Sequence, residues 1–275
     1  RDQLSRVPTN LVFNLFEGFY DYPESEYEVA DILFEMNFRF TGCHARALKL
    51  ALDKGGSKTL LCQYGVDVPE FQVLNPYNIR KFRLNFPCIV KPRNQDASHG
   101  ITPASVVNNM EELKKQVSVV SKQFGREAIV EEFAGGREFN ITVIGNEEIM
   151  VLPPSEIVYL LPPDLPRVLT YEAKWISDSE YFKKTTVACP APIDEELRAE
   201  IARVAVTAYR AFDCSGYARV DMRMDSNDRL KVLEVNPNPD ISPDTGAARQ
   251  AYHAGISYSQ FIDQIVDYAV ERVPA

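Results

Sequence analysis

Two short runs of residues joined by a turn constrain this 275-residue chain more than any other feature. Residues 218–225 read ARVDMRMD, and residues 230–236 read LKVLEVN. Apolar and polar side chains alternate in the first run, which is the period of a β-strand with one buried face. The intervening Ser-Asn-Asp-Arg is typical of a tight turn. The sequence therefore predicts an antiparallel β-hairpin over residues 218–236.

The register of this hairpin predicts a metal site. A turn centred on residues 227–228 places Asp221 directly opposite Glu234, and Arg219 opposite Asn236. Two carboxylates that face each other repel, and a cation between them removes the repulsion. Asp221, Glu234 and Asn236 supply only oxygen ligands, which suits Mg²⁺ or Mn²⁺ and not zinc.

The alternative is a solvated hairpin face that merely carries charge. Leu230 and Val232 are expected to share a face with Glu234 and Asn236, which argues against a simply wet surface. Protein-bound Mg²⁺ usually takes one or two carboxylates and completes its shell with substrate phosphates. The hairpin therefore predicts a site for magnesium and a nucleotide.

Hydrophobic periodicity predicts helices and strands in mixed order along the rest of the chain. Asn109 and Asp194 are expected to cap helices, and Gly125 is expected to end the first of these. The expected strands cover residues 10–15, 38–41, 71–74, 87–92, 128–133, 139–144 and 148–153, and the expected helices cover 26–37, 43–54, 57–64, 110–124, 195–212 and 261–269. A Pro-rich loop is expected from residue 153 to the YEAKW segment. This mixture predicts an α+β or α/β chain with at least one antiparallel sheet.

Composition narrows the possible partners and the cellular location. The net charge of -9 leaves no basic stripe for a phosphate backbone, so neither a nucleic acid nor a membrane is expected as a partner. No apolar run approaches the roughly 18 residues of a membrane span. The five cysteines are scattered and lack C-x-x-C spacing, which favours the reducing cytoplasm. The chain begins RDQLSR and reads as a fragment or a processed form.

Two segments supply candidates for holding a nucleotide. Lys91 ends the apolar PCIVKP strand, and the following loop with Ser98 and Gly100 can fold over phosphates. Residues 127–140, EAIVEEFAGGREFN, form a strand, a tight turn and a strand. Their extended backbone can bind an adenine edge, and Glu138 can accept from ribose hydroxyls. An acidic surface is the alternative for Glu138 and for its neighbours in this segment.

Taken together, these motifs resemble the ATP-grasp enzymes, and within them the D-alanine–D-alanine ligases. The resemblance rests on Lys54, IVKP, VEEFAGGREF, YEAKW, ARVD and LEVN in this order, and it runs from about Asn10 to the final helix. YEAK followed by DSEY and CPAPID is its most specific element. It implies an α+β ATP-grasp fold with two α+β subdomains, over 53–135 and 136–275, that clasp ATP. A truncated α/β segment over 1–52 would precede them on the substrate side.

The resemblance also implies a role for each matching residue. Arg219, Lys174 and Tyr171 would be catalytic, with Tyr171 supporting loop closure. The ATP-binding residues would be Lys54, Lys91, Ser98, Glu131, Glu132, Phe133, Ala134 and Glu138, and the metal ligands Asp221, Glu234 and Asn236. Trp175, Asp240 and Thr245 would lie on the substrate side. The expected reaction is amide formation from a carboxylate and an amine through an acylphosphate, with ATP and Mg²⁺ or Mn²⁺.

The chain departs from the family pattern mainly where the acceptor should bind. The family's N-T-x-P-G-M-T is replaced by NPNPDIS, which places Asp240 where a glycine amide is expected. Thr245-Gly246 replaces a Ser-Leu pair, Glu17-Gly18 replaces a His-Gly pair, and Trp175 replaces a tyrosine. In the phosphate loop, Asp96 and Ala97 replace glycine and serine. We therefore predict an altered substrate with the nucleotide site retained.

Several alternatives stay open on the sequence alone. The chain is also compatible with an ATP-grasp phosphotransferase or carboxylating enzyme, or with an ATP-binding module without catalysis. The expected partners are small amino acids or peptide-like molecules, and a homodimer is one assembly to test. Asp240 can bind a substrate amino group or cap a turn, and Trp175 can line the pocket or pack a loop.

Overall fold

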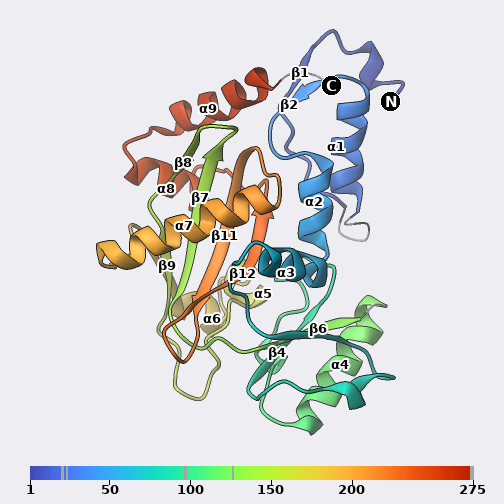
Figure 1. The fold of residues 1–275 in the computed structure, drawn as a ribbon, viewed down its shortest axis with the longest axis vertical. Coiled ribbons are helices and arrows are strands. Elements are labelled where there is room, and N and C mark those ends of the chain that lie inside the picture. The colour runs from blue at the N-terminus through green and yellow to red at the C-terminus, as the bar shows by residue number, and fades with distance from the viewer. Residues whose placement is uncertain (20–21, 23, 96–97, 126, 273–275) are drawn as a thin grey trace.

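The computed structural model describes residues 1–19, 22, 24–95, 98–125 and 127–272. Within this part of the chain, the helices pack on a six-stranded sheet, a four-stranded sheet and a small parallel strand pair (Figure 1). Both larger sheets are antiparallel, which confirms the predicted α+β class. No helix in the described ranges is both long enough and apolar enough to cross a membrane.

The four-stranded sheet lies at the lower right of Figure 1. Its strands in spatial order are β3 (Phe71–Leu74), β6 (Ala128–Glu132), β4 (Cys88–Pro92) and β5 (Val106–Val107). Helix α4 (Met110–Phe124) covers one face through Leu113 and Val117. The Asn109 side chain accepts from the first-turn amides, and Gly125 ends the helix with a φ of 64°. The predicted cap and stop are therefore confirmed.

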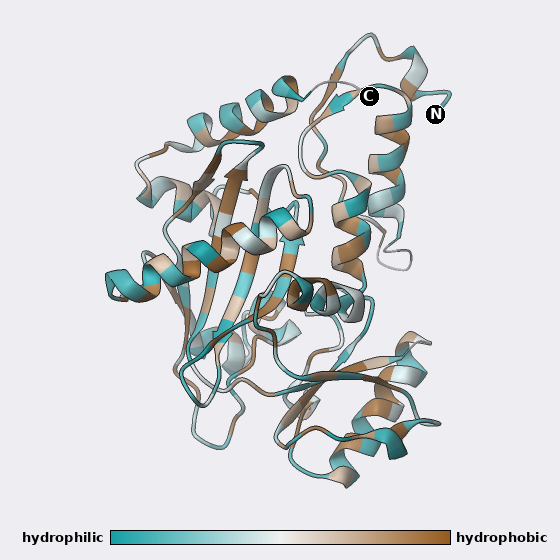
Figure 2. Cartoon of the chain, in the orientation of Figure 1, coloured by the Kyte–Doolittle hydropathy of each residue, from teal (hydrophilic) through white to brown (hydrophobic). Residues whose placement is uncertain are grey.

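The six-stranded sheet carries helices on both faces. Its strands are β10 (Thr185–Ala188), β9 (Ser155–Tyr159), β7 (Glu138–Gly145), β11 (Gly216–Met224) and β12 (Leu230–Pro237), with β8 (Ile149–Val151) paired to β7. Helix α7 (Glu195–Ala211) packs on one face, and α8 (Gly246–His253) and α9 (Tyr258–Glu271) pack on part of the other. Figure 2 shows hydrophobic residues along the central strands between these layers. The rest of the second face carries Glu138, Asp221 and Arg223, which line a cavity together with residues of the four-stranded sheet and of α5 (Tyr171–Trp175).

The N-terminal part joins this core through helices. Strands β1 (Leu11–Val12) and β2 (Arg39–Phe40) pair in parallel, and α1 (Ser25–Glu35) packs against α2 (Ala45–Leu52). Helix α3 (Lys54–Gln63) follows directly and contacts both β3 and β12. It begins at Lys54 rather than at residue 57, because the Asp53 side chain caps it by accepting from the Gly55 amide. Lys54 and the adjacent residues thus stand between the two larger sheets.

The segment predicted as a long loop contains regular structure. Strands β9 and β10 pair with each other, and the short helices α5 (Tyr171–Trp175) and α6 (Glu180–Lys184) lie between them. Prolines flank β9, so the hydrophobic pattern of this segment did not predict a strand. The expected loop from residue 153 to the YEAKW segment was therefore wrong at β9 and is confirmed over residues 160–170.

The predicted hairpin is present, with one correction. Asp221 pairs with Glu234 and Arg219 with Asn236, as predicted, but the register shifts by one residue between Asp221 and Met222. Met222 consequently pairs with Val232, and the bulge turns Glu234 to the face opposite Val232. Leu230 and Val232 lie in the core beneath α7, so the prediction that they share a face with Glu234 and Asn236 was wrong.

Candidate nucleotide and metal site

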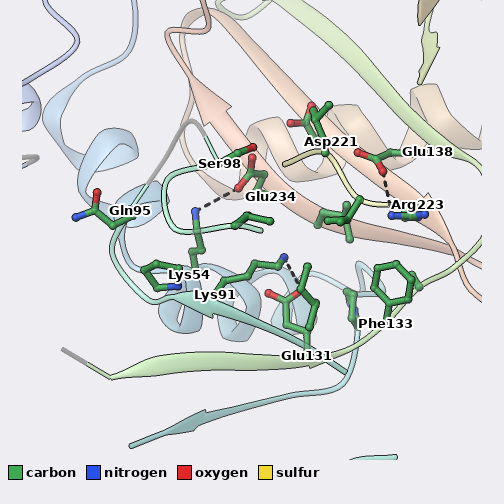
Figure 3. A pocket seen from close by; sticks show the side chains of 18 of the residues that line it. Lys54, Lys91, Gln95, Ser98, Glu131, Phe133, Glu138, Asp221, Arg223 and Glu234 are labelled. Atoms are coloured by element: carbon green, nitrogen blue, oxygen red, sulfur yellow. Dashed lines mark hydrogen bonds and ion pairs between the residues drawn. The ribbon is translucent and has the colours of Figure 1, made fainter. Parts of the chain in front are cut away.

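A cavity of about 800 Å³ lies between the two larger sheets and brings most of the predicted residues together (Figure 3). This space is partly open to solvent. The predicted residues that line it are Lys54, Lys91, Ser98, Glu131, Glu132, Phe133, Ala134, Glu138, Lys174, Asp221 and Glu234. They come from α3, the four-stranded sheet and the segments that follow its strands, α5, and the face of the six-stranded sheet that α8 and α9 leave uncovered. The fold therefore collects side chains that are far apart in sequence.

The two facing carboxylates of the hairpin are held by cations and an amide. Arg219 makes a two-point contact with Asp221, through Nε at 2.7 Å and Nη2 at 2.8 Å. Asn236 Nδ2 donates to Asp221 Oδ2 at 2.9 Å, and Lys54 Nζ lies 3.2 Å from Glu234 Oε2. Arg219 and Asn236 thus adjoin the cavity by touching Asp221. The mutual repulsion predicted for the two carboxylates is relieved here by Arg219 and Lys54.

Positive charge converges on Glu234 from several elements. Burial alone would raise the pKa of the Glu234 carboxyl, but Lys54, Lys91, Lys174 and Arg219 hold it well below its ordinary value. Burial lowers the pKa of the Lys174 ammonium, and Arg219 adds to that effect. An electropositive cluster with ionised carboxylates at its centre is suited to binding a polyanion such as a phosphate chain.

Beneath the cavity, Glu131 is buried between two lysines. Its carboxylate lies 2.9 Å from Lys91 Nζ and 3.4 Å from Lys58 Nζ. Lys58, which the sequence analysis missed, also donates to the Leu233 carbonyl at 2.9 Å. Burial lowers the Lys58 pKa to about 8. The spacing of Lys58 four residues after Lys54 puts both on one helix face, and that signal could have revealed it.

The segment after β6 offers a backbone edge to the cavity. The Glu132 amide donates to the Glu70 carbonyl at 2.9 Å, and the Phe133 amide donates to the Pro87 carbonyl at 2.9 Å. Across the described ranges, no acceptor takes the Ala134 amide, and Ala134 lines the cavity. The Ala134 amide is therefore a donor on the cavity wall that is left for a ligand.

Glu138 is a buried carboxylate with two donors on a single oxygen. Tyr159 Oη donates to Oε2 at 2.8 Å, and Arg223 Nη1 lies 3.1 Å from the same oxygen. Burial raises the pKa of Glu138, while Arg223 and Tyr159 oppose that rise. The sequence analysis gave Arg223 no role, because the pairing of β11 with β7 was not predicted.

Two segments meet over the cavity. The Tyr171 amide donates to the Ile101 carbonyl at 3.2 Å, and the Tyr171 ring lies 5.6 Å from the His99 ring, centroid to centroid. Trp175 lies further out, 6.4 Å from Tyr171, and is 61% exposed. Tyr171 thus joins the α5 segment to the phosphate loop beside Ser98. The predicted changes at positions 96 and 97 fall outside the described residues.

Asp240 and Thr245 lie in the turn before α8 and are not among the residues that line the cavity, although the charge of Asp240 acts on Arg219. Asp240 Oδ1 accepts from the Ser242 amide at 2.8 Å, and Thr245 Oγ1 donates to the Asp240 carbonyl at 2.9 Å. Asp240 therefore caps a turn, as one of its two predicted roles requires. Burial raises the pKa of the Glu17 carboxyl, and the charge of Asp240 raises it further.

Among the described residues, side-chain acids, cysteines and histidines alone do not form a metal site. In the ranges that the structure describes, no group of three or more His, Cys, Asp or Glu side chains converges. Asp221 and Glu234 are two carboxylates, and Asn236 adds an amide oxygen. A cation here must take further ligands from phosphate or water, as magnesium commonly does.

Comparison with known proteins identifies the family. Residues 60–267 match the family model for the C-terminus of D-ala D-ala ligase. The chain is 33% identical over 239 residues to a D-alanine–D-alanine ligase of Bordetella petrii, which covers 85% of this chain and 69% of that protein. It is 29% identical over 269 residues to the Haemophilus influenzae D-alanine–D-alanine ligase, covering 95% of this chain and 84% of that protein.

Solved structures show the same architecture. The VanG D-Ala:D-Ser ligase from Enterococcus faecalis superposes with a TM-score of 0.78 and 25% identity, covering 96% of this chain and 74% of that one. The D-alanine–D-alanine ligase from Bacillus anthracis complexed with ATP gives a TM-score of 0.74 at 21% identity, covering 98% and 81%. The chain therefore belongs to the D-alanine–D-alanine ligase family and has the ATP-grasp fold that its sequence predicts.

Proposed function

We propose that this protein joins a carboxylate to an amine at the expense of ATP, through an acylphosphate, with Mg²⁺ and with a substrate other than a pair of D-alanines. Membership in the family makes it an ATP-dependent carbon–nitrogen ligase. One observation carries the proposal for this chain. The facing pair Asp221 and Glu234 lines the cavity and is surrounded by cations, which are Lys54, Lys91, Lys174 and Arg219.

The nucleotide is proposed to lie along the cavity between the sheets. The Ala134 amide would bind the adenine edge, next to Glu132 and Phe133, and Glu138 would accept from the ribose. Lys54, Lys91 and Ser98 would contact the phosphates. Glu131 would support the nucleotide site indirectly by holding Lys91 and Lys58, because its carboxylate is paired with both lysines. The proposed clasp divides the chain into 53–135 and 136–275, with 1–52 on the substrate side, in keeping with the two separate larger sheets.

The residues around Asp221 fit a magnesium ion. The ligand atoms that these residues offer are all oxygens, and the residues lie on paired strands. Lys54 and Arg219 balance the charge of the two carboxylates, and a bound phosphate chain can draw these cations toward itself. Asp221, Glu234 and Asn236 would hold the ion. When bound, it would neutralise charge on the phosphoryl oxygens.

The chemistry follows from the weak electrophilicity of a carboxylate. A carboxylate oxygen of the substrate attacks the γ-phosphorus, ADP leaves, and an acylphosphate forms. The amine then attacks the carbonyl carbon, loses a proton, and displaces inorganic phosphate. Lys174 would stabilise charge on the transferred phosphoryl group, and Arg219 would stabilise the oxyanion of the tetrahedral intermediate. Tyr171 would hold the covering segments together and exclude water.

The residues expected on the acceptor side are the basis for proposing an altered substrate. The turn at Asp240 and Thr245 replaces the family's glycine-containing segment, and the charge of Asp240 acts on Glu17. The carboxylates of Asp240 and Glu17 would bring negative charge to a region where the family has a neutral backbone amide. Small amino acids or peptide-like molecules remain the expected substrates, with Trp175 at the outer rim.

The proposed function is tested by amino-acid-dependent phosphate release from ATP. The purified protein is incubated with Mg²⁺–ATP and a panel of D- and L-amino acids and dipeptides, and phosphate and amide products are measured together. We expect stoichiometric phosphate and amide for at least one pair, and weak product from D-alanine alone. Phosphate without amide would favour a phosphotransferase, and full coupling of two D-alanines would overturn the altered substrate.

A metal prediction follows for Glu234. In Glu234→Gln one carboxylate of the pair is lost, so the Mg²⁺ concentration for half-maximal activity should rise about tenfold or more, by analogy with the loss of one charged ligand interaction. The measurement is a Mg²⁺ titration of phosphate release at fixed ATP. Glu195→Gln, which changes an exposed glutamate on α7, is the matched control and should leave the titration unchanged. An unchanged titration in Glu234→Gln would remove this residue from the proposed ligands.

A further inference from the structure

Arg223 is a buried arginine in the wall of the nucleotide cavity. It lies on β11 directly opposite Glu138 on β7, and its side chain is only 3% exposed. Nε donates to the Gly136 carbonyl at 3.1 Å, and Nη1 lies 3.1 Å from Glu138 Oε2. Figure 3 shows Arg223 between Glu138 and Phe133 at one end of the cavity. The guanidinium is therefore fixed by the large sheet and by the loop that precedes β7.

Two aromatic rings fix the guanidinium further. Its carbon lies 4.9 Å from the centroid of Phe133 and 5.6 Å from that of Tyr159. Tyr159 also donates its hydroxyl to Glu138 Oε2, the oxygen that Arg223 contacts. Phe133 belongs to the segment that offers its backbone edge to the cavity. Arg223 thus connects that segment to Glu138.

These contacts leave the two oxygens of Glu138 in different states. Oε2 takes both donors, whereas Oε1 has no hydrogen-bond partner among the residues described. Oε1 is not one of the fully buried polar atoms that lack a partner. It is therefore accessible from the cavity that Glu138 lines. An ionised carboxylate oxygen only accepts hydrogen bonds. A ligand group at Oε1 must therefore be a donor.

Simple packing does not account for Arg223. Its Nη2 atom is buried and, within the described ranges, has no partner. A buried charge with an unsatisfied donor is a costly way to fill space, and an apolar side chain of similar volume is often as stable or more stable. The arginine is therefore better explained by its effect on Glu138, whose charge it balances and whose orientation it fixes.

We propose that Arg223 is a positioning residue that, with Tyr159, holds Glu138 so that Oε1 accepts a hydrogen bond from a ribose hydroxyl of the nucleotide. The proposal rests on the ATP site proposed above and adds the residue that gives it sugar selectivity. A ribose hydroxyl donates to Oε1, and a deoxyribose lacking that hydroxyl cannot. The site should therefore prefer ATP over a deoxynucleotide, and the preference should depend on Arg223.

Calorimetric binding of ATP, 2′-deoxyATP and 3′-deoxyATP tests this, with Mg²⁺ and without amino acid. The wild type should bind ATP about tenfold to a hundredfold more tightly than one of the deoxynucleotides, as expected for one hydrogen bond to a charged group. Arg223→Met should reduce that ratio to near one, mainly by weakening ATP. Arg223→Lys should restore part of it, and Tyr159→Phe should reduce it less.

The controls separate positioning from general damage. Glu138→Gln should lower the ratio by itself, and adding Arg223→Met to it should change the ratio little further, because both act through one carboxylate. Arg229→Met, an exposed arginine in the same hairpin, should leave the ratio unchanged. A wild-type ratio near one, or a full ratio in folded Arg223→Met, overturns the inference while ATP binding persists. Absence of ATP binding by the wild type would instead overturn the proposed function.

Discussion

Arg219→Met should lower kcat for amide formation about a hundredfold to a thousandfold, the usual loss when one preorganised oxyanion donor is removed. Arg219 is held by Asp221 through two hydrogen bonds, so its guanidinium meets developing charge without reorganisation. The loss should fall mainly on kcat, because the proposed adenine and ribose contacts are made by other residues, Ala134 and Glu138. Steady-state measurement of kcat and of the KM for ATP checks this.

Two further variants sharpen the Arg219 result. Arg219→Lys keeps the charge but loses the two-point contact, so its kcat should lie between those of the wild type and Arg219→Met. Arg229→Met changes an arginine of the same hairpin that is paired with Asp225 near the turn, and it should keep wild-type kcat. A kcat for Arg219→Met within fivefold of wild type would exclude the proposed oxyanion role.

Glu131→Gln should lower the free energy of unfolding by about 3–5 kcal/mol, the usual cost of removing one member of a buried ion pair. Glu131 and Lys58 are each 1% exposed, and Lys91 is close to the same carboxylate. Without Glu131, the Lys58 ammonium would be buried near Lys91 without its paired carboxylate. Urea unfolding at neutral pH measures the loss, and Glu132→Gln on the same strand is the control.

The Glu131 effect should depend on pH in a defined direction. The pKa of Lys58 is lowered to about 8 by burial, so the folded state binds fewer protons than the unfolded state at higher pH. Loss of Glu131 lowers that pKa further. The stability deficit of Glu131→Gln should therefore be largest below the variant's own lowered Lys58 pKa, shrink as the pH rises from there towards 8, and be smallest above pH 8, where Lys58 is neutral in both folded proteins.

A double variant tests whether the lost pair itself causes the deficit. Adding Lys58→Met to Glu131→Gln removes the uncompensated charge, so most of the lost stability should return. If the double variant is as unstable as the sum of its single changes, then packing rather than charge governs this part of the core.

The hairpin shows how much of the site could be predicted from sequence. Alternation and turn chemistry were enough to place Asp221 opposite Glu234, because the period of a strand is fixed. They could not reveal the bulge, which depends on how β12 packs against α3 and α7. The predicted pairing is right at the metal residues, although the predicted faces are wrong for Leu230 and Val232.

The missed residues share a different cause. Lys58 and Arg223 take their roles from partners on other elements, Glu131 on β6 and Glu138 on β7. Those pairings depend on strand order, which hydrophobic period does not specify. Strands β9 and β10 were missed because prolines surround one and a charged segment precedes the other. Long-range pairing, rather than local propensity, therefore separates the predicted part of the site from the rest.

Oxygen transfer from carboxylate to phosphate is the most direct test of the proposed chemistry. An amino acid that supports phosphate release is labelled with oxygen-18 in its carboxyl group, and the phosphate produced with amide is examined by mass spectrometry. Attack of the carboxylate on the γ-phosphorus predicts one labelled oxygen in each phosphate released. Unlabelled phosphate would show that water or another group accepts the phosphoryl group, and it would contradict a ligase that works through an acylphosphate.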